Sequence, residues 1–398
     1  MSYLTFNNGA APATPAAGKC TLFVATDGRI AKIDEKGSIS YLGEQDLNNY
    51  LHNSGFWFAQ RQTPGTPAAY SSTAGRAISG DRWGITNENA SVNYSRTDTG
   101  TTPETGLQSK YYGNFNKITS TGKFMVTQVV EARDSQSLRG RTVRVQFWMK
   151  ASSSKTIRLG LIQLANAAAD DTVPATFISA HGAGGTDPTL GTNVAYIAPK
   201  SGVTPDNCTV SGNACNCSVT TSWQRFGAVF DVPSNVRNLI PAVWTDGQFT
   251  ATTDTLSLAQ ASLTDGYEIQ DWSPCDISEE LRNCQRYYCK SFDTDTAPAQ
   301  NAGLAGAVRG YVSVAGATAN QPIGVRFPVQ MRAAPATFVF YNPSAANAFV
   351  RNTTAGTDAT ATASSTPAGS GTDIFFTGIA AWTVAQAVAV HFSADAEI

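Results

Sequence analysis

Alternation of apolar and polar side chains is the feature that most constrains the fold of this chain. The stretch 142–151 reads TVRVQFWMKA, and every second side chain in its centre is apolar. A β-strand turns alternate side chains to opposite faces, so this pattern predicts a strand with one face in a core. The two predicted faces are Val143, Val145, Phe147 and Met149, and Arg144, Gln146, Trp148 and Lys150.

Short apolar runs of the same kind recur through residues 47–274, with Gly, Pro, Asn and Asp between them. The other runs are GFWFAQRQ, GKFMVTQVVEA, TIRLGLIQL, WQRFGAVFDV, LIPAVWT and TLSLAQASL. Regular short strands separated by turn residues are typical of two-sheet β-sandwiches, and we expect a jelly roll here. Two turn-rich inserts, near 166–195 and 200–220, are expected to interrupt it.

The most helix-like stretch follows this region and reads DISEELRNCQRYYCKSF, residues 276–292. Asp276 and Glu279 form a D-x-x-E variant of the capping box after Pro274, which predicts a sharp helix start. We therefore expect a helical joint over residues 275–290, between two β-rich regions.

Helical spacing also predicts what this joint presents to its neighbours. Leu281, Tyr288 and Cys284 would share one face, suited to packing on a domain or on other copies of the chain. Cys284 and Cys289 would point about 140° apart on an ideal helix, so we expect no bond between them while both are helical.

Residues 291–398 again read as strands, and no repeat of about 20–50 residues occurs in the chain. The predicted strands are RGYVSVAG, PIGVRFPV, ATFVFYNP, DIFFTGI and AVAVHFSA. The segment 353–373, TTAGTDATATASSTPAGSGTD, is predicted to be an exposed loop.

The first 46 residues form a distinct leader, in which a Pro/Ala/Gly segment precedes a small predicted meander. Its strands are Cys20–Thr26 and Arg29–Ile33, joined through the hairpin signal at residues 27–28, and a further turn is expected at residues 36–37. This leader is either an attachment module or an ordered tail.

The predicted architecture is therefore all-β. It comprises a small N-terminal attachment segment (1–46), a jelly-roll β-sandwich (47–274), the helical joint (275–290) and a C-terminal β domain (291–398).

Composition excludes some partners. The formal net charge is −2, and only 15% of the residues are charged, against about 25% in typical soluble domains. This balance offers no basic footprint for a nucleic acid, and no run of about 18 apolar residues predicts membrane insertion. The N-terminus lacks a basic segment followed by an apolar one, so we expect synthesis in the cytosol without a signal peptide.

The chain has seven cysteines, all of them disulfide candidates. They are Cys20, the triad Cys208, Cys215 and Cys217, and the triad Cys275, Cys284 and Cys289. A zinc site is the rival interpretation, but NCTVSGNACNC has C-x-C where zinc fingers usually show C-x₂-C. We favour disulfides formed after the protein leaves the cell. The odd number leaves one thiol free or joined to another protein, and Cys20 is the candidate.

Several segments resemble modules of tailed-bacteriophage fibre and tail proteins. TPAAGKCTLFVATDGRIAKIDEKG is similar to their N-terminal attachment segment, and LRNCQRYYCKSFD to a recurrent join between their domains. NSGFWFAQRQ with DRWGI, and RTVRVQFWMKAS with WQRFGAVFDVP, resemble their carbohydrate-binding-module-like jelly rolls. VAVHFSADAEI resembles a common fibre C-terminus.

The resemblance implies a virion protein that attaches to other virion proteins through its N-terminal segment and associates with itself, commonly as a homotrimer. Such proteins occur as tail fibres, tail spikes, and head or collar fibres. The chain departs from the usual pattern at Cys284 and Cys289 and in its cysteine-rich insert. Made in the host cytoplasm and released by lysis, it would reside in the virion.

Tryptophans supply the candidate binding residues, since a flat ring offers a face on which sugar C–H groups stack. Trp148 is predicted to lie beside Arg144 and Gln146 rather than with the apolar set. Trp223 is predicted to share a strand face with Arg225. Any single tryptophan is more often core or interface, and Trp83 of DRW is expected in the core, with Asp81 and Arg82 paired.

Catalytic patterns are weak. HGAGG at His181 has no G-x-S-x-G partner and reads as a glycine-rich loop. Carboxylate pairs at 279–280 and 170–171 read as helix-dipole partners and turn residues. Asp293 and Asp295 of DTDT lack the further ligands of a calcium loop. We expect no catalytic residue, no metal and no cofactor.

The sequence thus supports one main hypothesis and one alternative. The main hypothesis is a trimeric virion fibre or spike whose jelly roll binds host surface polysaccharide. The alternative is an architectural head, collar or neck fibre, stabilised by disulfides and without a specific receptor. A tail-spike enzyme is a distant third.

Overall fold

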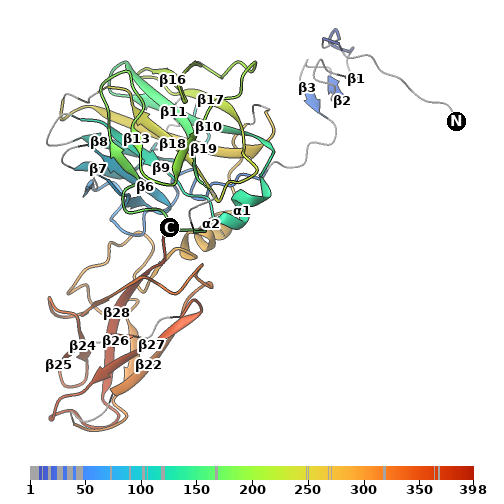
Figure 1. Cartoon of the computed structure of the whole chain (residues 1–398). Coiled ribbons are helices and arrows are strands. Elements are labelled where there is room, and N and C mark those ends of the chain that lie inside the picture. Colours follow the sequence, from blue (N-terminus) through green and yellow to red (C-terminus); the bar gives the residue numbers. More distant parts are fainter. Residues whose placement is uncertain are drawn as a thin grey trace. The chain divides into compact units, whose positions relative to one another are not determined.

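The computed structural model forms two compact units, Met1–Asn48 and Asn49–Ile398 (Figure 1). The four-part division predicted from the sequence stays a prediction. The residues that the structure describes are 9–10, 12–16, 19–24, 30–33, 39–41, 48–71, 74–88, 91–100, 104, 106–117, 122–165, 169–247, 249, 251–267, 269, 271–316, 320–362, 364–365 and 368–398.

The first unit holds an antiparallel meander in the order β1–β2–β3. Its strands are β1 (Thr21–Val24), β2 (Ile30–Ile33) and β3 (Ile39–Tyr41). The two predicted strands are therefore present, and the predicted turns at residues 27–28 and 36–37 lie outside the described residues.

Two antiparallel sheets form the β-sandwich, β4 to β19. In the described part of the chain the first sheet has six strands, in the order β17–β10–β19–β8–β7–β4. These are β4 (Ala68–Tyr70), β7 (Val92–Asp98), β8 (Tyr111–Lys117), β10 (Thr142–Ala151), β17 (Gln224–Asp231) and β19 (Thr255–Asp265).

The second sheet has the order β15–β16–β11–β18–β9–β6–β5, with β14 also paired to β11. Its strands are β5 (Ala77–Gly80), β6 (Trp83–Asn87), β9 (Phe124–Thr127), β11 (Lys155–Leu164), β14 (Val194–Ile197), β15 (Cys208–Ser211), β16 (Ala214–Val219) and β18 (Asn238–Thr245). The all-β fold predicted from the sequence is confirmed.

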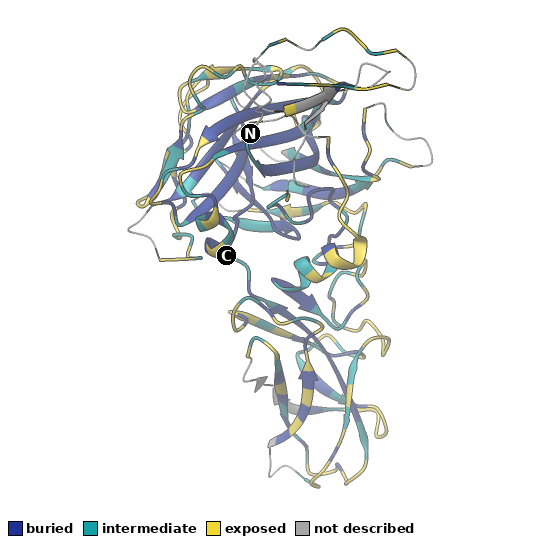
Figure 2. Cartoon of the chain, turned by 90° about the vertical axis from the view of Figure 1, so that its right-hand side faces the viewer, coloured by how far each residue is buried: buried dark blue, intermediate teal, exposed yellow. Residues whose placement is uncertain are grey.

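The main core lies between these sheets (Figure 2). The predicted apolar face of β10 is completely buried in it, as the alternation requires. Trp83 is also fully buried, stacks on Phe56 with ring centroids 5.1 Å apart, and donates its indole N–H to the Asn53 carbonyl. Its predicted place in the core is confirmed.

The run GFWFAQRQ is not a strand, contrary to the prediction. Residues 55–62 are irregular but mostly buried. The Asn53 side chain provides hydrogen-bond partners for backbone groups of this segment. The Asn53 side chain donates to the carbonyls of Phe58 and Asp81 and accepts from the Phe58 N–H. A buried amide here replaces the partner that a neighbouring strand would provide.

The two predicted inserts also contain strands. The first supplies β12 (Ile178–Ala180) and β13 (Thr189–Leu190), and its Phe177 and Ile178 pack with Ile162 and Trp244 on the outer face of the second sheet. The second supplies β15 and β16. Cysteines at alternate positions of β16 serve there as small apolar residues facing the main core.

The C-terminal β domain, β20 to β28, has its own core. The strands are β20 (Tyr288–Lys290), β21 (Val308–Tyr311), β22 (Asn320–Arg326), β23 (Thr337–Tyr341), β24 (Phe349–Asn352), β25 (Thr357–Thr362), β26 (Ser364–Ser365), β27 (Gly371–Thr377) and β28 (Ala387–Asp395). β28 pairs with β20, β21, β23 and β24, while β27 pairs with β22 and β26.

The segment 353–373 is only partly a loop, which corrects the prediction. Its Thr/Ala stretch forms β25 and pairs with β24, and Ala359 within it is completely buried. The sequence pattern did not predict this strand, because its small and polar residues lack the apolar alternation by which strands are recognised.

Two short helices are present in the described residues, α1 (Ala132–Ser137) and α2 (Ile277–Gln285). The predicted cap of α2 is confirmed, since Asp276 Oδ1 accepts from the N–H groups of Ser278 (2.9 Å) and Glu279 (3.2 Å). No helix in the described part of the chain is long and apolar enough to cross a bilayer.

The helix is shorter than predicted. Tyr288 and Cys289 lie in β20, opposite Asp395 and Ala394 of β28. Tyr288 therefore does not share a helical face with Cys284, and the angle expected between Cys284 and Cys289 does not apply. Pairing with β28 overrides the helical spacing at this point.

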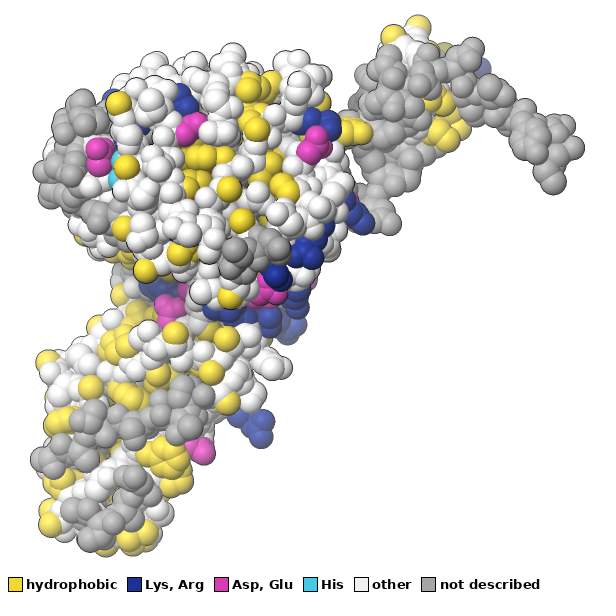
Figure 3. Space-filling model, in the orientation of Figure 1, with side chains coloured by type: hydrophobic (Ala, Val, Ile, Leu, Met, Phe, Trp, Pro, Cys, Tyr) yellow, Lys and Arg dark blue, Asp and Glu magenta, His cyan; other side chains and the backbone are white. Residues whose placement is uncertain are grey.

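Charged side chains gather where the β-sandwich meets the C-terminal β domain (Figure 3). Arg82 donates to Glu397, and its guanidinium lies 3.3 Å from the centroid of the Tyr287 ring. Asp81 pairs instead with Arg61, at 3.2 Å, so the predicted pairing of Asp81 with Arg82 is wrong. Partners distant in sequence satisfy both charges.

Glu131, like Arg82, lies where the β-sandwich meets the C-terminal β domain. Its carboxylate accepts from Nε and Nη2 of Arg286, both at 3.0 Å, and from the Tyr287 hydroxyl at 2.7 Å. Burial acts to raise the pKa of Glu131, but hydrogen bonds from Arg286 and Tyr287 outweigh it and hold the pKa below its ordinary value.

Glu280 faces the β-sandwich rather than solvent, which corrects its assignment as a simple helix-dipole partner. Only 4% of it is exposed, and its Oε1 accepts from the Ser54 N–H at 3.2 Å. Burial raises the pKa of this carboxyl to about 7.

The Glu280→Gln variant tests this burial. Because the folded pKa exceeds the unfolded one, protonated Glu280 stabilises the fold fully below pH 4.5, and this contribution is lost as the pH rises to about 7. We expect the glutamine substitution to remove that loss and make the free energy of unfolding about 3 kcal/mol larger than in wild type above pH 7. Urea unfolding from pH 4 to 8 measures the difference. Glu279→Gln, at an exposed position, is the control, and an equal pH dependence in both variants would contradict burial of Glu280.

Candidate functional site

The outer face of the first sheet carries the tryptophan singled out from the sequence. Trp148 lies opposite Arg225 of β17 and Ala259 of β19. The apolar face of β10 fills the core, so the other set of β10 side chains points away from it. The predicted facing of Trp148 is confirmed by this register.

Three aromatic side chains form what we call the aromatic patch: Trp148, Tyr112 and Trp223. The rings of Tyr112 and Trp223 meet edge to face, with centroids 5.3 Å apart. All three pack with Leu107 and Ala259 in a small apolar cluster apart from the main core. Trp223 is 8% exposed, whereas Trp148 and Tyr112 are half-buried, so these two present the accessible rings.

An ion pair frames the patch. Lys150 Nζ lies 5.0 Å from the ring centroids of both Tyr112 and Trp223, within cation–π range. It also pairs with Glu104, whose Oε2 accepts the indole N–H of Trp223. The carboxylate thus holds the ammonium and the indole together, which fixes both rings.

Arg144 and Gln146 share the face with Trp148 but are each only 3% exposed. Arg144 donates from Nε to Gln146 Oε1 (2.7 Å) and from Nη1 to the Tyr267 carbonyl (3.1 Å), and Gln146 donates to Ser262 Oγ. Their polar atoms therefore serve neighbouring residues of the chain. A role for them in glycan binding stays a prediction.

Arg225 lies at the edge of the same face and is partly exposed. Its Nε donates to Asp206 Oδ2 at 2.8 Å, and its Nη1 lies 3.6 Å from Asp271. The structure therefore brings Trp148, Trp223 and Arg225 onto one surface, with Arg225 held by acidic neighbours.

Sequence reasoning missed Tyr112 and Glu104. The stretch 111–117, YYGNFNK, carries a usable signal, because Asn114 and Asn116 alternate with Phe115, and Tyr112 falls in register with the two asparagines. Glu104 lies in a connection between strands and has no such signal.

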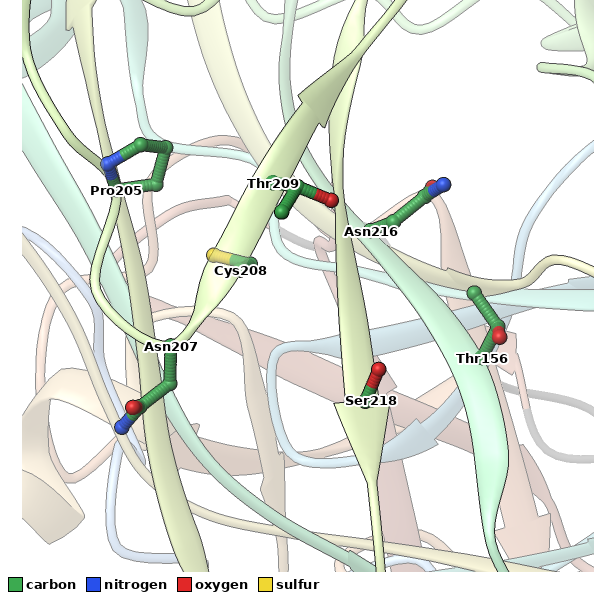
Figure 4. A pocket seen from close by; sticks show the side chains of 7 residues that line it. All are labelled: Thr156, Pro205, Asn207, Cys208, Thr209, Asn216 and Ser218. Carbon is green, nitrogen blue, oxygen red and sulfur yellow. The ribbon is translucent and has the colours of Figure 1, made fainter.

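A polar hollow of about 410 Å³ lies elsewhere, around the edge strand β15 (Figure 4). Its lining is Thr156, Pro205, Asn207, Cys208, Thr209, Asn216 and Ser218. No aromatic ring lines it, so it lacks the stacking surface of the aromatic patch.

All seven cysteines are free thiols in the structure. Cys20 and Cys275 are exposed, and Cys284 and Cys289 are buried. Cys289 Sγ contacts the sulfur of Met331 at 3.9 Å. The predicted disulfides stay predictions.

The weaker catalytic and metal patterns have structural roles. Lys123 Nζ donates to the carbonyls of His181, Ala183 and Thr186, which pins the glycine-rich loop. Asp295 receives both terminal nitrogens of Arg96, each at 3.1 Å. Among the described residues, no group of three or more His, Cys, Asp or Glu side chains is arranged to hold a metal ion.

No family model matches the chain, and neither does any curated protein sequence. Among solved structures, part of the chain is similar to the enzymatically active domain of tailspike protein 4 from bacteriophage CBA120, with a TM-score of 0.29 and 10% identity over 55% of this chain and 21% of that one. The chain thus spans about a fifth of that domain's length.

Two xylan-related proteins also align. The CBM22-1 xylan-binding domain of Paenibacillus barcinonensis Xyn10C gives a TM-score of 0.28 and 8% identity over 57% of this chain and 100% of that one. The CBM22-1 and GH10 modules of Clostridium thermocellum xylanase 10B give a TM-score of 0.27 and 10% identity over 54% of this chain and 30% of that one.

Substitution of Gly106 tests how the aromatic patch is built. Gly106 has a φ of +92°, and an added Cβ would lie 2.8 Å from the Trp148 ring. We expect Gly106→Ala to cost about 2–3 kcal/mol of unfolding free energy, from backbone strain and the clash, and to alter tryptophan fluorescence.

Gly100→Ala is the matched control, since Gly100 has a φ of +77° with open space where the Cβ would be. It carries the backbone strain alone and should cost about 1 kcal/mol without a spectral change. Equal costs and unchanged emission in both variants would show that residue 106 does not rest on Trp148.

Proposed function

We propose that this chain is a structural protein of a tailed-phage virion, a fibre or spike that binds host surface glycans through the aromatic patch. The observation that carries the binding proposal is the half-buried pair of rings, Trp148 and Tyr112, on the outer face of the first sheet. The virion assignment rests on the sequence resemblance described above.

The chemistry of the patch suits a neutral sugar. Fixed rings offer C–H stacking surface at little entropic cost, because Trp and Tyr have few rotatable bonds. Lys150 and Glu104 stand at the rim, where they can exchange hydrogen bonds with hydroxyl groups. Asn114 of β8, hydrogen-bonded to Ser257, extends the polar face beside the rings.

Self-association would multiply a weak site. We propose a homotrimer attached to other virion proteins through the N-terminal unit, so that several patches act with a high effective concentration. Exposed apolar side chains of the C-terminal β domain offer contact surface for other copies, among them Tyr311 (70% exposed) and Val384 (58%).

One observation favours the architectural alternative. The backbone at Gly106 lies against the Trp148 ring, and Trp223 is mostly covered. Part of the stacking surface is therefore already used within the chain. A head, collar or neck fibre without a receptor would need the aromatic patch only to hold Glu104, Gly106 and Leu107.

Glycan-array binding by the purified protein distinguishes these functions. We expect wild type to bind host surface polysaccharide and Trp148→Ala to bind at least about tenfold more weakly, because a central aromatic hot spot supplies about 2 kcal/mol or more and a factor of ten corresponds to about 1.4 kcal/mol. Trp57→Ala is the control, a half-buried tryptophan that packs on Tyr111 outside the aromatic patch.

If Trp148→Ala and Trp57→Ala lost glycan binding equally, the loss would reflect a folding defect rather than removal of a contact in the aromatic patch. Wild-type protein that binds no host polysaccharide would instead support the architectural function. Release of reducing ends from the polysaccharide would require an enzymatic function.

A further inference from the structure

Three thiols lie together at the edge of the second sheet. Cys208 of β15 is directly opposite Cys217 of β16, and Cys215 precedes Cys217 by two residues on the same face. Cys215 and Cys217 are completely buried, whereas Cys208 is half-buried and lines the polar hollow. Figure 4 shows its sulfur directed away from Thr209 and Asn216.

The hairpin register decides which pair is close enough to bond. β15 and β16 are joined by a two-residue turn, Gly212–Asn213, with Ser211 opposite Ala214. In such a hairpin the closing pair is hydrogen-bonded and the pairs then alternate, so the third pair beyond it, Cys208 with Cys217, is not hydrogen-bonded.

Distances follow from this register. Residues of a non-hydrogen-bonded pair have Cα atoms about 4.5 Å apart, within the range that a disulfide spans. Cys215 lies opposite Val210, so it is diagonal to Cys208, and diagonal Cα atoms are about 7–8 Å apart. That separation is too long for a disulfide without movement of the backbone.

We propose that Cys208 and Cys217 are a redox site that forms an intrachain disulfide by exchange with a small-molecule disulfide, while Cys215 remains a thiol. The site is independent of the aromatic patch and of the proposed glycan binding.

The exchange balances in two steps. The Cys208 thiolate attacks one sulfur of the small disulfide, which forms a mixed disulfide and releases one small thiolate. Cys217 then attacks Cys208 Sγ and releases the second. The small disulfide is reduced to two thiols, which take up the two protons from the cysteines, and the protein loses two hydrogen atoms.

The surroundings give the two cysteines different parts in this exchange. Hydrogen bonds from the thiols of Cys215 and Cys217 hold the pKa of Cys208 well below its ordinary value, so the thiolate forms more readily at Cys208, the less buried of the two residues. Burial raises the pKa of Cys217. The closing step should therefore be the slower one and should accelerate as pH rises.

The bond would also fasten the edge where the two sheets meet. Asp206 exchanges backbone hydrogen bonds with Gly227 of β17 in the first sheet, and two residues later Cys208 pairs with β16 in the second. Asp206 also accepts from Arg225, which lies opposite Trp148. A Cys208–Cys217 bond would join β15 to β16 covalently beside this hydrogen-bonded corner of the β-sandwich.

The test uses folded, full-length protein and oxidised glutathione as the probe. After oxidation, free thiols are alkylated, and intact mass and fragmentation of the 208–217 peptide are measured. We expect wild type and Cys215→Ala to lose two hydrogen atoms within the chain, while Cys208→Ala and Cys217→Ala retain the mass or stop at the mixed disulfide. Thermal unfolding of each variant confirms its fold, and Cys215→Ala is the matched control for loss of a buried thiol.

A bond that persists in Cys217→Ala, or disappears in Cys215→Ala, would overturn the proposed pairing. So would a Cys208 bond between chains, seen as a dimer on non-reducing electrophoresis. If Cys217→Ala fails to fold, fragmentation of the wild-type peptide still decides between Cys215 and Cys217 as the partner of Cys208. Wild type that stays reduced when native but oxidises when unfolded would also contradict the site.

Discussion

The burial of Arg82 is the constraint on which the rest of the structure depends. Its side chain is 2% exposed, and a cation removed from water needs compensating partners. It obtains them from the Glu397 carboxylate, the Tyr287 ring and the Val129 carbonyl. These groups come from the chain after β28, from the segment after α2 and from the segment after β9. One guanidinium thus requires three distant parts of the chain to meet.

This requirement explains where sequence reasoning succeeded and where it failed in the fold. The alternation in β10 and the Asp276 cap depend only on residues close in the sequence, so both were predictable. The partner of Arg82 was not, because Glu397 lies far along the chain and the adjacent Asp81 looked sufficient. The helix was predicted too long for the same reason, since β28 captures Tyr288 into a strand.

In the candidate site, too, features set by local periodicity were predictable, and features set by distant segments were not. Periodicity placed Trp148 on the solvent side of β10, and the structure bears this out. Periodicity says nothing about what covers that face, so the burial of Gln146, and of Arg144 with its hydrogen bond to the Tyr267 carbonyl, could not be foreseen. Tyr112 belongs to a strand that was not recognised, and Glu104 to a connection without any pattern. Residues brought together by topology rather than by spacing escape a linear analysis.

The pairing of β28 has a mechanical consequence. Over its nine residues it pairs with β20 and β23 toward one end and with β21 and β24 toward the other. A pull along the strand would load these hydrogen bonds together in shear, whereas peeling a hairpin breaks them one at a time. Resistance to such a pull is set by the rate of unfolding rather than by equilibrium stability. Glu397 is held by Arg82 just beyond the strand. A pulling force on the tip of the C-terminal β domain would therefore pass along β28 to the β-sandwich.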